Sequence, residues 1–540
     1  MTPRLGIVLD RLDIEAWQEA MLQKIEADQA GTTVVILLCR ELPRMRQANA
    51  VLSLYQLLDR RLFKYRPDAF KKRSIRTLLP EVPIVEFSLG AQGDGGTHLS
   101  DAGRLMIESH RLDVILHLAA SAPLPALGPM AGYGVWSILE GDQILFRGGP
   151  PGFWELAENS PVIGSVLRVE RGSRERSHIL ASSFSRTHKL SLNKSRNITL
   201  WKAASFVPRA LRELSKLGGK EFIRRLEQEE KNPRFQSGRV RSGPGLVASL
   251  GFLFRQLWRT MAAFASRKLT IDQWMLAFSF GEKVNTSFWS YERIVPPKDR
   301  FWADPQVIRR NGEYFVFIEE YPYARRKGHV SVFKLSPGAR PESPTTVLER
   351  DYHLSFPFVF EWNGICYMIP ETSKNGTIEL YESGAFPQGW KLRKVLMDNV
   401  RAVDTTLLHH AGLWWLFANI AENEGGETTD ELFVFWANDF LSDEWKPHPM
   451  NPVVSDVRTS RPAGRIFEAG GSLIRPSQDC SEEYGGGVNF QRIVTLTTSK
   501  YKEESALACK PEWDKQVVGL HTYSRDADLA VIDLCLRRRS

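Results

Sequence analysis

The first third of the chain alternates short apolar runs with segments of helical spacing. The runs 32–39 (TTVVILLC) and 112–119 (LDVILHLA) predict buried strands, whereas residues 13–25 and 46–63 place apolar side chains at helical intervals. Strands that are apolar throughout are typical of a parallel sheet covered by helices on both faces. The pattern therefore predicts a Rossmann-type α/β domain over residues 1–190.

The next segment, residues 191–270, combines many basic residues with helical patterns. We interpret it as a basic helical linker whose last helix packs its apolar face on a neighbouring part of the chain. The alternative is a helix on a membrane surface, in peripheral contact with lipid through residues 244–265. Its longest uncharged stretch ends at Arg255 and is too short to span a bilayer.

Residues 271–540 predict an all-β domain because a strand–turn–strand pattern recurs in them. The turn glycines are 52, 48 and 59 residues apart, and a period of about 50 residues is typical of one four-stranded propeller blade. A fifth blade would join residues 274–280 to the C-terminal run ADLAVIDLCL and close the ring. We therefore predict a five-bladed β-propeller, whose two-residue turns are Asn311-Gly312, Asn363-Gly364, Ala411-Gly412 and Gly470-Gly471.

Composition and charge narrow the class of protein. Of the 540 residues, 43% are hydrophobic and 25% are charged, as in soluble globular proteins. The net charge of +8 suits acidic glycans, nucleic acid or an anionic membrane, but the aromatic residues lie on predicted propeller strands, so we expect no nucleic-acid partner. The five cysteines form no C-x-x-C pair, which predicts free thiols. Because the N-terminus also lacks a signal-peptide core, we expect a cytoplasmic protein.

Counting from the turn glycines identifies acidic residues at related positions in the blades. Asp304 and Asp404 each lie eight residues before a turn glycine, and Glu371 lies seven residues after another. Equivalent positions lie at the same height around a propeller axis, so we expect these three carboxylates to converge as catalytic groups. Clustered carboxylates raise one another's pKa values, and acid–base chemistry on a sugar is one use for them. The alternative is that they cap strand ends or bind arginines.

Further residues near these acids predict a carbohydrate-binding site without a metal. Arg401 and Arg461 could offset the negative charge, and Asp479 lies eight residues after its turn glycine in the fourth repeat. Trp302 and Tyr321 could stack on the apolar face of a sugar ring. Carboxylates accept hydrogen bonds from sugar hydroxyls, so a carbohydrate or glycolipid is the predicted substrate.

The propeller segments FWADP (301–305) and VDTTL (403–407) resemble those of arabinanase-type glycoside hydrolases. In that family one Asp is the general base, a second Asp tunes pKa values, and a Glu in a later blade is the acid. The likeness implies that Asp304 and Asp404 are the two aspartates. Glu371 departs from the family order because it precedes Asp404, and Glu431 is a second candidate for the acid.

A longer set of segments is similar to the propeller at the N-terminus of plant glucosamine inositolphosphorylceramide transferases and of bacterial relatives. The segments are WADP, GHVSVFKL, PFVFEWNG, IPETS, TIELY, VDTTL, SRPAGR and RPSQDCS. In the plant enzymes glycosyl transfer belongs to a separate C-terminal domain, which we do not find in this sequence. The likeness therefore implies a glycan or glycolipid context rather than a reaction.

Residues 133–156 (YGVWSILEGDQILFRGGPPGFWEL) resemble the folate-dependent formyltransferase fold. Folate is implied only by this likeness, and the cofactor is otherwise unknown. The family's Arg-Gly loop matches Arg147, whereas its catalytic Asn-x-His pair maps onto Val135 and Ser137, which lack acid–base capacity at neutral pH. Ser137 and Arg147 are thus candidate substrate contacts, and the residues that could replace the lost pair are His117, His178 and Glu140.

Three functions from different classes fit these observations. The first is a protein of glycan or glycolipid biosynthesis, with a formyltransferase-like transferase domain and a carbohydrate-binding propeller. The second is a glycoside hydrolase that uses the propeller carboxylates. The third is a non-catalytic glycan-binding protein with a degenerate transferase domain.

Overall fold

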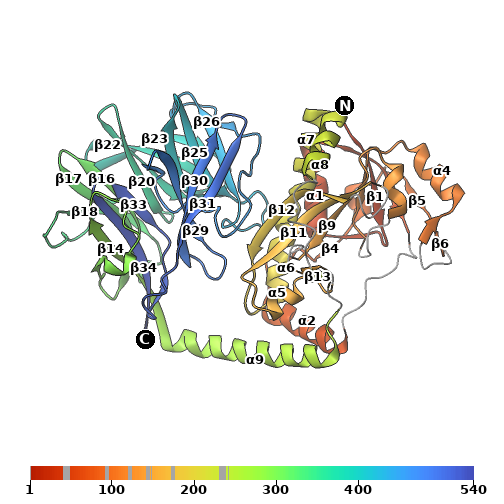
Figure 1. The fold of residues 1–540 in the computed structure, drawn as a ribbon, viewed down its shortest axis with the longest axis horizontal. Helices are drawn as coiled ribbons and strands as arrows, with labels where there is room; N and C mark the ends of the chain where they lie inside the picture. The colour runs from red at the N-terminus through yellow and green to blue at the C-terminus, as the bar shows by residue number, and fades with distance from the viewer. Residues whose placement is uncertain are drawn as a thin grey trace. The chain divides into compact units, whose positions relative to one another are not determined.

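The computed structural model describes residues 2–39, 49–91, 97–119, 125–141, 146–147, 149–171, 177–229, 239–240 and 243–539. The chain divides into two compact units. The first unit comprises residues 1–260 with 423–426, and the second comprises 261–422 with 427–540 (Figure 1).

The first unit is built on a seven-stranded sheet with the order β12-β11-β9-β8-β1-β3-β5. The five strands from β9 to β5 are parallel to their neighbours, and β11 and β12 continue the sheet antiparallel. The strands are β1 (Arg4–Leu9), β3 (Thr32–Leu38), β5 (Ile84–Glu86), β8 (Val114–His117), β9 (Val135–Glu140), β11 (Val162–Glu170) and β12 (Ser177–Arg186). The predicted α/β fold with a parallel sheet is thereby confirmed.

Both faces of this sheet are buried because consecutive side chains of its apolar strands point to opposite sides. Ile7 of β1 belongs to one hydrophobic cluster, together with Trp17 and Met21 of α1 (Ala16–Ala27). The next residue, Val8, belongs to a second cluster with Ile107 of α4 (Asp101–Ser109). This arrangement explains why the strands are apolar at every position.

The segment expected to be a basic linker contributes three helices to the core of the first unit. These helices are α6 (Leu192–Ala203), α7 (Phe206–Leu217) and α8 (Gly219–Glu229). Their side chains Trp201, Phe206, Leu211 and Phe222 are buried in the same cluster as Ile7. Lys and Arg occupy the outer faces of α7 and α8, so the basic composition concealed amphipathic helices that complete the domain.

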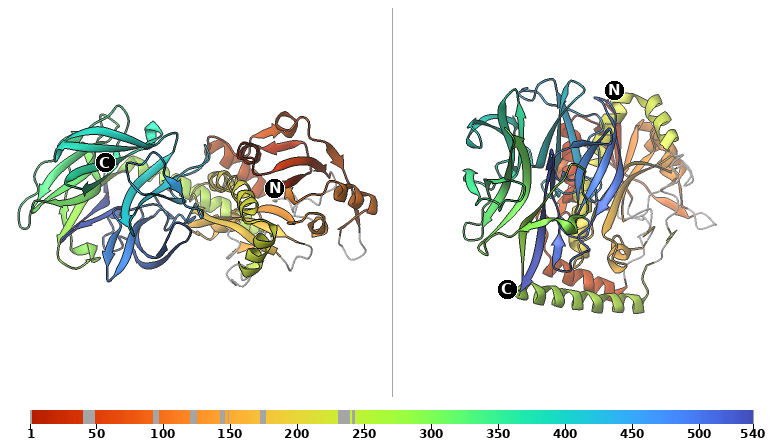
Figure 2. Two further views of the ribbon diagram at one scale, coloured as in Figure 1. Left: turned by 90° about the horizontal axis from the view of Figure 1, so that it is seen from above. Right: turned by 60° about the vertical axis from the view of Figure 1, so that its left-hand side comes forward.

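A fourth helix of this segment, α9 (Leu246–Leu269), follows residues that lie outside the described ranges. Its N-terminal part lies beside α2 (Ala50–Leu62) in the views of Figures 1 and 2. No helix in the described part of the chain combines the length and the apolar character needed to cross a bilayer.

The second unit is a five-bladed β-propeller, as predicted. The first blade is β16 (Arg300–Arg310), β17 (Glu313–Pro322), β18 (His329–Leu335) and β19 (Thr345–Leu348). The second is β20 (Ser355–Trp362), β21 (Ile365–Thr372), β22 (Thr377–Ala385) and β23 (Gln388–Met397). The third is β24 (Ala402–His410), β25 (Leu413–Ile420), β26 (Leu432–Ala437) and β27 (Lys446–Pro447), and the fourth is β28 (Phe467–Ala469), β29 (Ser472–Asp479), β30 (Gly487–Leu496) and β31 (Tyr501–Cys509).

The fifth blade joins the two ends of the propeller. In it β14 (Thr270–Phe280) pairs along its whole length with β34 (Leu529–Arg539), and β15 (Glu292–Ile294), β32 (Val517–Gly519) and β33 (Tyr523–Asp526) complete the sheet. This closure confirms the predicted joining of residues 274–280 to the C-terminal run, and it leaves the ring without an open seam.

The four turns that revealed the repeat have the geometry expected from their residues. Both central residues have positive φ in every case, from Asn311 at 52° and Gly312 at 83° to Gly470 at 57° and Gly471 at 71°. Such turns match the right-handed twist of the flanking strands.

Candidate functional site

The first strands of three blades share one unusual backbone position. Asp304, Phe356 and Asp404 have positive φ values of 51°, 41° and 49°, and each lies at a β-bulge. These are the positions that the sequence repeat equates. Asp is one of the few residues that adopts this left-handed conformation readily, and bulges re-aim side chains. The shared backbone kink therefore gives Asp304 and Asp404 equivalent orientations in their blades.

Five side chains from the five blades, or from the segments leading into them, lie within one interacting group. Residues of all five blades can meet only near the propeller axis, so we call this group the axial cluster. Its members are Asp304 on β16, Glu371 on β21, Asp404 on β24, Arg461 before β28 and His521 between β32 and β33. Asp304, Glu371 and Asp404 therefore lie near enough to act on one another's charge, and their catalytic role stays a prediction.

Arg461 is the cation at the centre of this cluster. Its Nε donates to Asp404 Oδ2 over 2.6 Å, and a terminal nitrogen donates to Oδ1 over 3.3 Å. Gln478 Nε2 also donates to Asp404 Oδ2, over 2.7 Å. Both members of the ion pair are buried, so their charges are neutralised by each other rather than by water.

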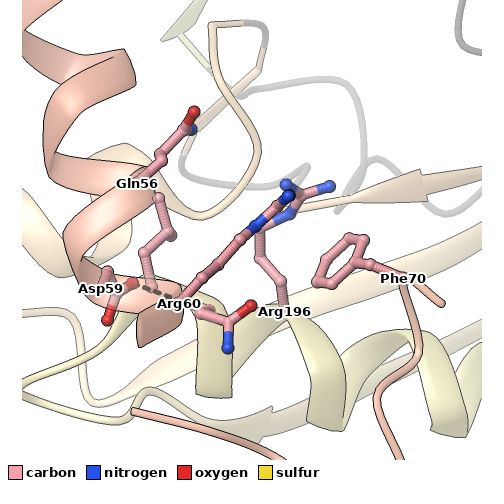
Figure 3. Close-up of a pocket in the computed structure, with 7 residues that line it drawn as sticks. Gln56, Asp59, Arg60, Phe70 and Arg196 are labelled. Atoms are coloured by element: carbon pink, nitrogen blue, oxygen red, sulfur yellow. Dashed lines mark hydrogen bonds between the residues drawn. The ribbon is translucent and has the colours of Figure 1, made fainter. Parts of the chain in front are cut away.

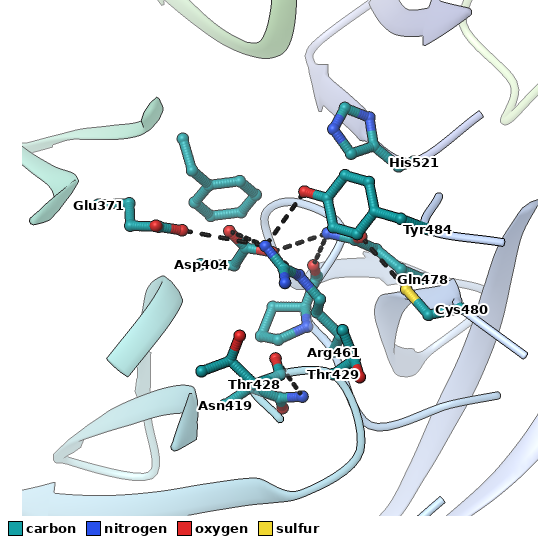
Figure 4. Close-up of polar contacts among 12 residues, drawn as sticks. Glu371, Asp404, Asn419, Thr428, Thr429, Arg461, Gln478, Cys480, Tyr484 and His521 are labelled. Atoms are coloured by element: carbon teal, nitrogen blue, oxygen red, sulfur yellow. Dashed lines mark hydrogen bonds and ion pairs between the residues drawn. The ribbon is translucent and has the colours of Figure 1, made fainter. Parts of the chain in front are cut away.

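Glu371 lies at the edge of this ion pair. Its carboxylate is 3.9 Å from Arg461, and its side chain remains 13% exposed (Figure 4). Burial and the neighbouring Asp404 raise the pKa of Glu371 to about 8. At neutral pH this carboxyl group therefore carries a proton and can donate a hydrogen bond.

The other side of the cluster is organised around His521. Its Nε2 is 3.3 Å from Asp304 Oδ1, and its Nδ1 is 2.6 Å from Oδ2 of Asp533 on β34. Asp304 also accepts from the Thr522 hydroxyl over 3.1 Å and from the Phe356 backbone N–H over 3.2 Å. Both carboxylates are therefore held by internal partners.

Charge coupling shifts the ionisation of these groups. Burial raises the pKa of Asp304 to about 6. The nearby His521 lowers this pKa, and the negative charge of Asp404 raises it further. Burial also raises the pKa of Glu319 well above its usual range, with Asp304 and Glu371 as additional causes. The pKa of His521 is raised, because the attraction of Asp533 and Asp304 outweighs the cost of burying its charge.

Asp304, His521 and Asp533 place three ligand atoms within 4.8 Å of one another, a spacing that could hold a metal ion. Both ring nitrogens of His521 already face a carboxylate. In this arrangement the imidazolium is the cation between the two acids, and the three residues satisfy one another's charges.

Tyr484 gives the cluster an aromatic surface. Arg461 donates to its hydroxyl over 3.1 Å and lies 4.8 Å from the centre of its ring (Figure 4). The residue is 43% exposed, although its hydroxyl points inward. Tyr484 and the protonated carboxyl of Glu371 thus both contact Arg461. An aromatic side chain and hydrogen-bonding groups around one centre suit a sugar, whose ring has an apolar face and hydroxyl edges.

The other predicted propeller residues occupy different surroundings. Trp302 is 8% exposed and packs in a core cluster with Val307, so little of its ring is accessible to a ligand. Tyr321 is half-buried and stacks on Phe301 with 4.7 Å between ring centroids. Arg401 lies at an exposed position just before β24.

Asp479 and Glu431 also lie apart from the central ion pair. Asp479 is buried at the end of β29, where its Oδ1 accepts from the Ser481 backbone and hydroxyl over 3.0 and 2.6 Å, as a loop cap does. Glu431 is buried, and its Oε1 accepts from the Ser455 hydroxyl over 3.2 Å.

Four residues around the axis escaped the sequence analysis. Tyr484, His521 and Asp533 belong to the last two blades, and Glu319 lies on β17 of the first blade. The corresponding turn of the fifth blade, Ala527-Asp528 between β33 and β34, contains no glycine. The count from a turn glycine that located Asp304 and Asp404 therefore has no starting point in this blade, and its offsets do not lead to His521 or Asp533.

The front unit lacks the acid–base pair of a formyltransferase at the matching positions. Val135 and Ser137 lie on β9 and are buried, and the Ser137 hydroxyl has no hydrogen-bond partner within the described residues. His117 is on the neighbouring strand β8, where burial lowers its pKa to about 4. The Arg147 side chain falls outside the described residues. No formyl-transfer step through folate follows from these groups.

The other two residues that could replace the Asn-x-His pair, Glu140 and His178, are bonded to another side chain or buried. Glu140 accepts two hydrogen bonds from Arg196, over 2.7 and 2.8 Å, and His178 is buried on β12. Arg196 also borders a small pocket (Figure 3). The guanidinium groups of Arg196 and Arg60 lie 4.7 and 5.0 Å from the centre of the Phe70 ring in this pocket. The lining residues are Gln56, Asp59, Arg60, Phe70, Leu192, Asn193 and Arg196.

Residues 290–524 match the family described as "Glucosamine inositolphosphorylceramide transferase 1, N-terminal". The propeller is similar to the N-terminal part of that transferase. The proteins of this name from Oryza sativa subsp. japonica and Arabidopsis thaliana are 37% and 35% identical to the chain over 206 residues. Those residues are 38% of this chain but 27% of each relative, so the chain matches about a quarter of the length of these curated relatives. The predicted likeness to the propeller of these transferases is confirmed.

Solved structures resemble the chain only distantly. They include Zg3597, a family 117 glycoside hydrolase from Zobellia galactanivorans (12% identity, TM-score 0.33, 49% of this chain and 90% of that chain). The GH62 α-L-arabinofuranosidase catalytic domain of Coprinopsis cinerea has 13% identity and a TM-score of 0.33, covering 45% and 94%. Glycinamide ribonucleotide transformylase 1 of Symbiobacterium toebii has 13% identity and a TM-score of 0.27, covering 40% and 88%. Resemblances as distant as these assign no function.

Proposed function

We propose that this protein acts in glycan or glycolipid biosynthesis and that its propeller binds a carbohydrate at the axial cluster. The observation that carries the binding role is that Arg461 contacts both Tyr484, a residue that is 43% exposed, and the protonated, partly exposed carboxyl of Glu371. Similarity to glucosamine inositolphosphorylceramide transferase 1 supports the biosynthetic context. The words of that name suggest a glucosamine or an inositol phosphate group as the ligand.

The bonding of the aspartates favours binding over hydrolysis. A general base needs a carboxylate oxygen that can reach a water molecule or a sugar hydroxyl. Asp404 is engaged by Arg461 and Gln478, and Asp304 by His521, Thr522 and a backbone N–H. Glycoside hydrolysis is the second candidate, since Glu371 has the raised pKa of a general acid.

The front unit is assigned no reaction of its own. Its predicted likeness to folate-dependent formyltransferases stays a prediction, and the residues at the catalytic positions do not supply that chemistry. A cytoplasmic location likewise stays a prediction.

The substitution Glu371→Gln separates the two candidates. A protonated Glu and a Gln both donate a hydrogen bond, so a binding site should keep most of its affinity at neutral pH, whereas acid catalysis should stop. Isothermal titration calorimetry with glucosaminyl-inositol phosphate and with glucosamine would measure binding by the full chain. A reducing-sugar assay on arabino-oligosaccharides would measure hydrolysis. Wild-type protein that neither binds these sugars nor cleaves the oligosaccharides would refute both functions.

A further inference from the structure

Helix α9 packs one of its faces on the first unit. Phe252 contacts Tyr55 of α2 and Phe153, with ring centroids 4.9 and 4.8 Å apart. Asn49 links the beginnings of the two helices, because it caps α2 through Leu52 N–H and donates to Ser249 Oγ over 2.8 Å. The N-terminal part of α9 is therefore fixed beside α2.

The opposite face of α9 is apolar and exposed. An α-helix repeats every 3.6 residues, so positions 247, 250, 254, 258 and 261 form one continuous stripe. In that stripe Val247 is 85% exposed, and Phe254, Trp258 and Met261 are 69%, 67% and 65% exposed. Leu246, Leu250 and Leu257 widen it. A contiguous apolar area of this kind is rare on soluble proteins unless another body covers it.

Helix α2 also exposes apolar side chains. Its residues Tyr55 and Leu52 are buried, whereas Leu54, Leu57 and Leu62 are about half exposed or more, at 51%, 50% and 67%. Figures 1 and 2 show α2 running beside the N-terminal part of α9. We call the exposed apolar side chains of the two helices within the first unit the α2–α9 surface, and its members are Leu54, Leu57, Leu58, Leu62, Leu246, Val247, Leu250, Phe254, Leu257 and Trp258.

The charges of the two helices have one sign. Helix α9 contains three arginines and one lysine and no acidic residue. Helix α2 ends in Arg60 and Arg61, and its only acid, Asp59, is buried. A second copy of the chain would bring the same positive charges against this surface, and like charges repel. An apolar area bordered by cations instead matches a lipid bilayer with anionic headgroups.

We propose that the α2–α9 surface docks the protein on an anionic lipid bilayer. Both helices would lie in the plane of the membrane, with their leucine, phenylalanine and tryptophan side chains among the acyl chains and their arginines at the headgroups. Neither helix is long and apolar enough to cross the bilayer. The membrane contact does not depend on the axial cluster, so each can fail without the other.

Co-sedimentation of the full chain with lipid vesicles tests the membrane contact. Vesicles of phosphatidylcholine with about 30% phosphatidylserine should bind the protein, and pure phosphatidylcholine vesicles should bind it at least several-fold more weakly. Added salt should weaken the binding to the anionic vesicles. The triple variant Phe254→Ser/Leu257→Ser/Trp258→Ser should bind vesicles at least about tenfold more weakly, because it removes three apolar side chains that the bilayer would bury.

Two further variants sharpen this test. Arg61→Gln/Arg255→Gln should weaken binding to the anionic vesicles on the order of tenfold and leave binding to neutral vesicles unchanged. Trp289→Ser removes an equally exposed aromatic residue from the propeller (69% exposed) and should change nothing. Wild-type protein that stays in the supernatant, or a triple variant that sediments like wild type, would overturn the membrane contact. The membrane contact would also be overturned if the triple substitution changed only the self-association of the protein without lipid, measured by sedimentation velocity. That result would identify a second copy of the chain as the partner of this surface.

Discussion

Arg461 and Asp404 form a buried ion pair in which the guanidinium Nε donates to the carboxylate Oδ2 over 2.6 Å. Asp404 enters this contact from a β-bulge with positive φ, and Arg461 from the segment that leads into the next blade. The pair therefore links the third and fourth blades by charge near the propeller axis. Within the described residues, the sheets of these two blades are not joined by a ladder of backbone hydrogen bonds. Removing either partner should act on the propeller as a whole.

Arg461→Met should destabilise the propeller by about 3–5 kcal/mol, because it leaves Asp404 buried without a partner. Urea unfolding followed by tryptophan fluorescence measures this loss. The double variant Arg461→Met/Asp404→Asn should recover part of it, since no unpaired charge remains. The surface pair Arg492–Glu504 supplies a control, and Arg492→Met should cost about 1 kcal/mol or less. Equal costs for the two arginines would contradict the structural role given to Arg461.

The stability of the propeller should fall as pH rises from 5 to 8.5. Glu371 has an ordinary pKa of 4.5 in the unfolded chain and about 8 in the fold, so the folded state holds its proton more tightly. Its contribution is present below the unfolded pKa and is lost as pH rises through 8. The raised pKa values of Asp304, at about 6, and of His521 act in the same direction.

Thermal unfolding midpoints across this pH range check the expectation. The midpoint should fall by several degrees, and the fall should be smaller in Glu371→Gln, which does not titrate. The lower bound of pH 5 keeps the acids with lowered pKa values, such as Glu320 at about 2, ionised throughout. A midpoint that rises with pH, or an unchanged slope in the Gln variant, would show that Glu371 is ionised in the fold.

Ala411→Asn should stabilise the propeller by about 0.5–1 kcal/mol. Ala411 has φ of 52° in a turn where the equivalent residues Asn311 and Asn363 have nearly the same angle. Asn tolerates this left-handed conformation better than Ala does. The reverse changes, Asn311→Ala and Asn363→Ala, should each lower the urea concentration at which half of the protein is unfolded. If all three substitutions shifted this midpoint in the same direction, the common turn geometry would be contradicted.

The sequence was sufficient for the parts of the site that the repeat makes equivalent. Asp304 and Asp404 are found by their distance from a turn glycine, and the structure gives both the same bulge and positive φ. Glu371 is found in the same way on a second strand. Arg461 was named only as a nearby charge, because no pattern in the sequence states which carboxylate an arginine will meet.

The sequence was insufficient where the fold departs from its own repeat. His521 and Asp533 come from the blade that combines both chain ends, and its turn, Ala527-Asp528, has no glycine to align. Trp302 was expected at the ligand because aromatic rings suit sugars, yet its strand position turns it into the core between blades. Residues 191–229 were expected to be a linker, since composition records their charge and not the face on which it lies.

The ring and the hydroxyl of Tyr484 should have separable roles. Tyr484→Ala removes the exposed ring and should weaken binding of the glucosaminyl-inositol probe roughly three- to tenfold, the range expected from an aromatic contact of about 0.5–1.5 kcal/mol. Tyr484→Phe keeps the ring and removes only the hydrogen bond from Arg461, so binding should change little while the stability of the propeller falls by about 1 kcal/mol. Calorimetric titration and urea unfolding of the same two variants measure both quantities.

Trp289→Ala, which removes an exposed aromatic side chain elsewhere on the propeller, should alter neither the binding nor the stability. If Tyr484→Phe weakened binding as much as Tyr484→Ala, the hydroxyl would be the group that meets the ligand, and stacking on the ring would be the wrong account of this site.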